Sequence, residues 1–100
     1  ASNVFTVKNN EIFTPKLSNE LLPGVTRDLL IELLNDNKMK VTEADISQED
    51  LLNADEVWCS SSTNAVVPIV KVDNTEIGSG KTGDISLFAH KITKDFVRSY

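Results

Sequence analysis

The chain has 100 residues, which is enough for one domain or part of one. Hydrophobic residues make up 40% and charged residues 25%, and these are ordinary globular values. The net charge is −5 and the lysines are scattered singly, so no basic stripe indicates a nucleic-acid surface, and no apolar run approaches the roughly 20 residues that span a bilayer.

The first quarter of the chain predicts a hairpin followed by a loop. Residues 4–7 have the composition of a strand, and Asn9-Asn10 is a turn signal. Residues 11–14 can return as the second strand, which ends before Pro15. We expect residues 17–22 to form a loop that leads into Pro23-Gly24.

A helix is predicted over residues 26–37. Its leucines recur at helical spacing and are separated by charged side chains. Gly24 gives the backbone freedom just before the helix, and Thr26 is a candidate cap or first-turn residue. Asp28 in the first turn suits the positive end of the helix dipole.

The rest of the chain alternates short strands with helices. A strand at residues 40–43 precedes a short helix at 47–52, where Ser47 and Asp50 have capping-box spacing. We expect further strands at 55–60, at 66–72 with an interruption at Pro68, and at 75–77, and a long amphipathic helix at 84–98. The predicted fold class is therefore α/β (mixed α+β), with short strands and two main helices.

Two stretches are suited to holding an anion. The turn and helix start at residues 22–27 present unpaired backbone N–H groups and the positive end of the helix dipole. Residues 60–63 are four consecutive hydroxyls between apolar runs, and buried hydroxyls need partners. Taken alone, the first stretch favours an ordinary helix entry. For the second stretch, an anion site and a solvated loop are about equally consistent with the sequence.

Other candidate sites favour simpler interpretations. Residues 78–82 contain Gly, Lys and Thr but lack P-loop spacing, so a flexible turn is expected there. The single cysteine, Cys59, excludes an intrachain disulfide framework, fits a reducing cytosol and indicates a small buried hydrophobe. His90, the single histidine, is expected on a helix surface, so no metal site is predicted. The acidic side chains are expected to form a solvated face: Asp45, Glu49, Asp50, Asp55 and Glu56.

Several motifs, taken in order along almost the whole chain, resemble the C-terminal half of class IV aminotransferases, the pyridoxal-phosphate enzymes of fold type IV. They are Ser2-Asn3-Val4-Phe5, Thr14-Pro15, Leu21-Leu22-Pro23-Gly24-Val25-Thr26-Arg27, the run from Ala54 to Thr63, Val67-Pro68-Ile69, Asp73, Ile77-Gly78 and Gly80-Lys81-Thr82-Gly83. The hydroxyl run after Glu-Val-Trp is most similar to D-amino-acid (D-alanine) aminotransferases. Branched-chain aminotransferases more often carry a glycine there, and aminodeoxychorismate lyases of the same fold are a further alternative.

The resemblance implies that the anion is the phosphate of pyridoxal 5′-phosphate. Leu22 matches the position that packs on the cofactor ring, and Gly24 opens the turn of the cradle. Val25 and Thr26 match the pair whose backbone N–H groups, with the threonine hydroxyl, hold the phosphate. The second phosphate-side loop is matched by Ser61 and Ser62.

The resemblance also implies that residues 1–100 are the C-terminal cofactor-binding portion, without the N-terminal domain. The family's Schiff-base lysine and its pyridine-nitrogen glutamate would both lie upstream, so no catalytic residue is assigned here and the fragment alone is expected to be inactive. The intact enzyme would act on amino-acid and 2-oxo-acid substrates as a cytoplasmic homodimer, without nucleic-acid or membrane partners. An alternative of another class is a non-catalytic module that binds phosphate or a partner protein.

Overall fold

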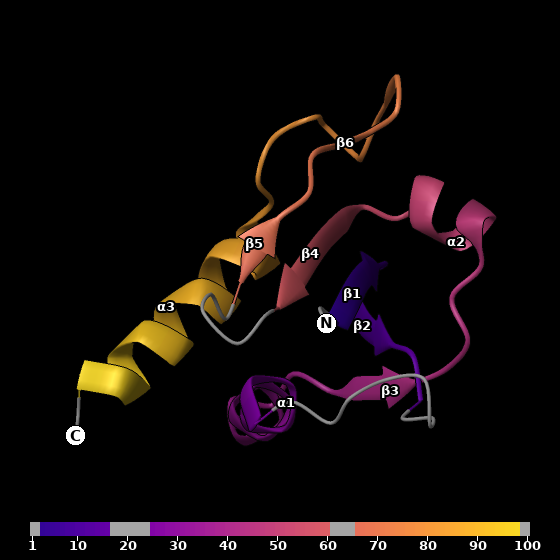
Figure 1. Cartoon of the computed structure of the whole chain (residues 1–100). Helices are drawn as coiled ribbons and strands as arrows, with labels where there is room; N and C mark the ends of the chain where they lie inside the picture. The colour runs from indigo at the N-terminus through magenta and orange to yellow at the C-terminus, as the bar shows by residue number, and fades with distance from the viewer. Residues whose placement is uncertain (1–2, 17–24, 61–65, 99–100) are drawn as a thin grey trace.

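A computed structural model describes residues 3–16, 25–60 and 66–98. Its centre is a five-stranded sheet in the order β3-β2-β1-β4-β5 (Figure 1). The sheet contains β1 (Asn3–Lys8), β2 (Glu11–Thr14), β3 (Val41–Glu43), β4 (Glu56–Ser60) and β5 (Val67–Pro68). Neighbouring strands are antiparallel except β2 and β3, which are parallel.

Helices α1 (Val25–Asp36) and α3 (Asp84–Arg98) lie against the same face of this sheet (Figure 1). Phe5 of β1 and Trp58 of β4 are opposite each other and their rings stack, with centroids 5.2 Å apart. Leu30 and Leu34 of α1 and Ala89 of α3 pack into the same cluster, and all three are fully buried. This cluster is the main core, and the strand residues that share its face lie under the helices.

The opposite face of the sheet carries a smaller apolar cluster. Val57 is adjacent to Trp58 in β4, so strand alternation places its side chain on this opposite face, where it packs with Ala54 and Ile77. Helix α2 (Gln48–Leu52) contributes Leu51 and Leu52 to its edge. A separate two-stranded sheet of β6 (Lys71–Val72) and β7 (Thr75–Glu76) lies on this side of the molecule (Figure 1).

The mixed fold class and most of the predicted elements are confirmed. Helix α1 begins at Val25, one residue earlier than predicted, so Thr26 lies in the first turn. The predicted capping box is present, because the Ser47 hydroxyl accepts the Asp50 N–H and the Asp50 carboxylate accepts the Ser47 N–H. The prediction of one interrupted strand at 66–72 is wrong. Val67–Pro68 forms the edge strand beside β4, and Lys71–Val72 pairs with β7 instead.

The loop between β7 and α3 is more constrained than the flexible turn that the sequence predicts. Gly78 has φ +56°, and a Cβ atom there would collide with the backbone carbonyl of Asp55. Gly83 precedes α3, and a Cβ atom there would collide with the carboxylate of Glu56. Gly78 is therefore required for close packing against the backbone before β4, and Gly83 leaves room for the Glu56 side chain at the start of β4.

Candidate functional site

Most of the predicted anion site falls outside the residues that the structure describes. Leu22, Gly24, Ser61 and Ser62 are among these, so their predicted roles stay predictions. Val25 and Thr26 are described as the first two residues of α1. Geometry at the site therefore comes from the residues that flank the two stretches.

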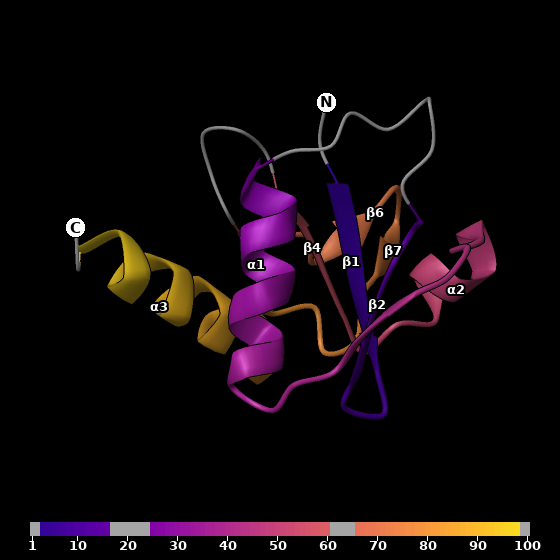
Figure 2. The same ribbon diagram turned by 90° about the horizontal axis from the view of Figure 1, so that it is seen from below.

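The flanking residues converge at one end of the sheet. Asn3 at the start of β1 is paired with Ser60 at the end of β4, immediately before the second stretch. The start of α1 lies at this same end of the molecule (Figure 2). Thr14 ends β2 beside the start of β1, where its hydroxyl donates to the carbonyl of Val4 at 2.8 Å.

Four polar residues are buried at this end, and we call them the polar layer: Asn3, Thr14, Arg27 and Ser60. Each is at most 9% exposed, although polar and charged side chains are usually found at the surface. Strand alternation places Ser60 on the same face as Trp58, which is the face under α1 and α3. The polar layer thus continues the main core toward the start of α1.

Arg27 joins the first turn of α1 to the ends of two strands. Its Nη2 donates to the carbonyl of Pro15 at 2.9 Å and lies 3.4 Å from Oε2 of Glu43, at the end of β3. Its Nη1 lies 3.4 Å from Oδ1 of Asp28. The Arg27 side chain is 2% exposed, whereas the two carboxylates are about half exposed.

Two atoms of the polar layer have no hydrogen-bond partner within the described part of the chain, Oγ of Ser60 and Nε of Arg27. A buried donor without a partner is unfavourable by about 1–3 kcal/mol, so such atoms indicate a missing partner. Both are donors, as an anion at the start of α1 requires. The residues present therefore fit a phosphate group.

The other long helix has an internal cap at its start. Oε1 of Glu56 accepts from the backbone N–H and the hydroxyl of Ser86, both at 2.7 Å, and Oε2 accepts from the N–H of Ile85 at 3.3 Å. A carboxylate therefore already occupies the place that an external anion would take. The helix start that follows the Gly-Lys-Thr loop therefore has the N–H groups of Ile85 and Ser86 already paired within the chain.

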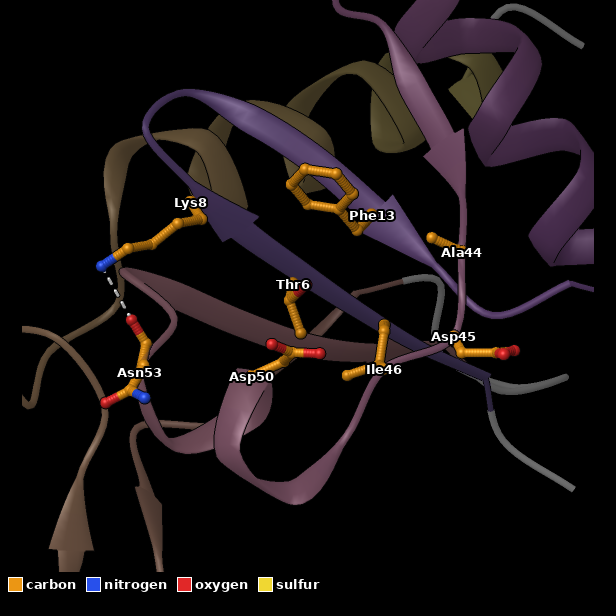
Figure 3. A pocket seen from close by; sticks show the side chains of 8 residues that line it. All are labelled: Thr6, Lys8, Phe13, Ala44, Asp45, Ile46, Asp50 and Asn53. Atoms are coloured by element: carbon orange, nitrogen blue, oxygen red, sulfur yellow. Dashed lines mark hydrogen bonds between the residues drawn. The ribbon is translucent and has the colours of Figure 1, made fainter.

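A cavity of about 320 Å³ lies on the opposite face, between β1, β2 and the segment that includes α2 (Figure 3). Thr6 and Phe13 line it from the sheet, and Asp50 lines it from α2. Lys8 at its rim donates to the carbonyl of Asn53 at 2.9 Å. The cavity is distinct from the polar layer, and the sequence alone does not indicate it, because its lining comes from three separate segments.

Glu56, Cys59 and His90 differ in how far their surroundings match the sequence-based expectations. The prediction that Glu56 belongs to a solvated face is wrong, because it is half-buried and caps α3. Cys59 is half-buried rather than buried, and burial raises the pKa of its thiol, which disfavours the reactive thiolate. His90 is exposed, as predicted.

Within residues 3–16, 25–60 and 66–98, no cluster of three or more His, Cys, Asp and Glu side chains is arranged to hold a metal ion. In the same part of the chain, no helix has both the length and the apolar composition to cross a membrane.

Comparison with known proteins identifies the class. Residues 1–72 match the family described as Amino-transferase class IV. The chain belongs to the class IV aminotransferase family. This is the family that the motifs around residues 22–27 and 54–63 resemble.

Individual relatives carry two different names. D-alanine aminotransferase of Bacillus licheniformis is 36% identical over 86 residues, which are 86% of this chain and 30% of that protein. Branched-chain-amino-acid aminotransferase of Escherichia coli K12 is 37% identical over 84 residues, or 84% of this chain and 27% of that protein. This chain thus spans less than a third of the length of these relatives.

The fold agrees with the sequence match. A crystal structure of an aminotransferase from Brucella abortus, bound to the cofactor PLP, superposes with a TM-score of 0.90 and 31% identity. The superposition covers 98% of this chain and 34% of that one. The described strands and helices therefore form the architecture of part of a class IV aminotransferase.

Proposed function

We propose that this chain is the C-terminal cofactor-binding portion of a pyridoxal-phosphate-dependent transaminase, in which it holds the cofactor phosphate. The observation that carries the proposal is the polar layer. It places unpartnered buried donors of Arg27 and Ser60 at the end of the molecule where α1 starts. The family match and a PLP-bound neighbour support phosphate as the anion.

In the proposed site, this chain binds and orients the cofactor. The first backbone N–H groups of α1, at Val25 and Thr26, would donate to the phosphate, and Ser61 and Ser62 would donate from the second stretch. Leu22 would pack on the cofactor ring and Gly24 would let the backbone turn closely. When bound, pyridoxal phosphate supplies an electron sink for amino-group transfer, while the protein supplies orientation and electrostatics.

We further propose that the whole enzyme exchanges an amino group between a D-amino acid, such as D-alanine, and a 2-oxo acid. The hydroxyl run Ser60-Ser61-Ser62-Thr63 supports this assignment, as does the similarity to D-alanine aminotransferases over 86 residues or more. A second candidate is branched-chain transamination, because branched-chain enzymes are equally similar, at 37% over 84 residues. We propose a cytoplasmic homodimer as its setting, and no activity for the fragment alone.

The test is amino transfer by the full-length protein. Purified enzyme with pyridoxal phosphate is incubated with 2-oxoglutarate and either D-alanine or L-leucine, L-isoleucine and L-valine. The D-amino-acid assignment predicts pyruvate formation from D-alanine. Activity confined to the branched L-amino acids would contradict it and favour the second candidate, whereas inactivity with both sets and no cofactor binding would favour a non-catalytic module.

A further inference from the structure

Arg27 is placed where helix stability alone does not explain it. It lies in the first turn of α1, at the positive end of the helix dipole, where cations are unfavourable and anions are favourable. It is also 2% exposed, and removing a guanidinium from water is costly unless it is well paired. The Glu43 and Asp28 carboxylates, both at 3.4 Å, are long for charge-assisted hydrogen bonds.

The contacts of Arg27 instead serve to fix the position of the helix start. The guanidinium is a rigid fork of donors, so its short bond to the Pro15 carbonyl restrains both the distance and the direction of the turn. Pro15 follows β2, and Glu43 ends β3, so the fork joins α1 to two adjacent strand ends. Nε has no partner within the described residues and remains as a spare donor at this end.

We infer that Arg27 is a positioning residue for the phosphate-binding start of α1. It holds the first turn against the ends of β2 and β3, so that the N–H groups of Val25 and Thr26 keep the direction that a phosphate requires. This inference rests on the proposed function and adds a residue that the motif comparison did not assign to the cofactor.

The experiment compares ligands with and without the phosphate. Pyridoxal 5′-phosphate and pyridoxal are titrated separately into the full-length apoprotein, and each Kd is measured by protein fluorescence. For Arg27→Met, we expect the Kd of pyridoxal 5′-phosphate to rise about tenfold while that of pyridoxal changes less than twofold. Inorganic phosphate, used as a competitor of the cofactor, should lose affinity in the same variant, which gives a second measurement without the ring.

The matched control is Lys91→Met, which removes one positive charge from an exposed ion pair with Asp95 on α3. It should leave all three affinities unchanged. If Arg27→Met does not fold, Arg27→Lys keeps the charge but lacks the fork, and we expect a smaller loss with the same preference for the phosphate.

An equal loss for pyridoxal and pyridoxal phosphate, or no loss for either, would overturn the positioning role while leaving the proposed function intact. If the wild-type protein binds pyridoxal phosphate no more tightly than pyridoxal, the proposed phosphate cradle itself is refuted. The two failures are therefore distinguishable.

Discussion

The carboxylate of Glu56 caps helix α3 through Ser86. Its Oε1 accepts both the backbone N–H and the hydroxyl of Ser86 at 2.7 Å. Ser86 is 1% exposed and Glu56 comes from β4, thirty residues earlier in the chain. The last helix is thus fixed to the central sheet by a side chain rather than by a residue of its own first turn.

Removing this carboxylate should destabilise the protein. Glu56→Ala leaves the N–H groups of Ile85 and Ser86 without their acceptor. We expect the free energy of unfolding to fall by about 1–2 kcal/mol, the usual effect of losing an N-terminal cap. Urea denaturation measures it, with Glu32→Ala on the exposed surface of α1 as the matched control. Equal unfolding midpoints for the two variants would contradict the capping role.

Gly83→Ala should also destabilise the protein, because it disturbs the Glu56 cap of α3 and not because it strains the backbone. The added Cβ atom would overlap the Glu56 carboxylate and displace it from the start of α3. The loss should therefore be much smaller in a Glu56→Ala background, because the group that it displaces is already gone. A double-mutant cycle on the free energy of unfolding checks this. Strict additivity of the two substitutions would show that Gly83 acts independently of Glu56.

The capping box of α2 should make the Asp50 carboxyl titrate low. The backbone N–H of Ser47 is the largest cause, and the Ser47 hydroxyl contributes as well, so the pKa of Asp50 lies below its ordinary value of 3.8. Since the folded-state pKa is lowered, the stabilisation is present above the unfolded pKa and is lost as the pH falls through the folded one. NMR titration of Asp50 should give a value below 3.8, and Ser47→Ala should raise it. An unchanged value in that variant would contradict the contribution of the hydroxyl, and a value of 3.8 or more in the wild-type protein would contradict the capping box as the cause.

Cys59 should react slowly with alkylating reagents at neutral pH. Burial raises the pKa of its thiol, so the reactive thiolate is rarer than in a free cysteine. The rate of modification by iodoacetamide, followed by mass spectrometry, should be lower in the native protein than after denaturation in urea. A native rate equal to the denatured one would show that the thiol is not shielded and that its pKa is not raised.

Local patterns predicted the elements well, and the reasons are visible in the contacts. The leucines of α1 have helical spacing, and the Ser47–Asp50 box is contained within four residues. Pro68 indicated an interruption of the predicted strand, and in the structure it ends the edge strand β5, which is separate from β6. Signals of this kind act over a few residues, so the sequence alone contains them.

Long-range roles were not predictable in the same way. Glu56 looked like part of an acidic surface because its partners, Ile85 and Ser86, follow about thirty residues later. The burial of Arg27 likewise depends on Pro15 and Glu43, which are brought together by the pairing of β2 with β3. The family motifs pointed to the cradle residues, but four of the six lie outside the described part of the chain.

The central claim is that this chain holds the phosphate of pyridoxal phosphate, and equilibrium titration of the full-length apoprotein with that cofactor tests it most directly. The wild-type protein should bind it, and Thr26→Ala and Ser62→Ala should each weaken binding. A lost hydrogen bond to a charged group is worth about 1.5–3 kcal/mol, which corresponds to a Kd raised by roughly 10- to 150-fold. Unchanged affinity in both variants, or no binding by the wild-type protein, would contradict the claim.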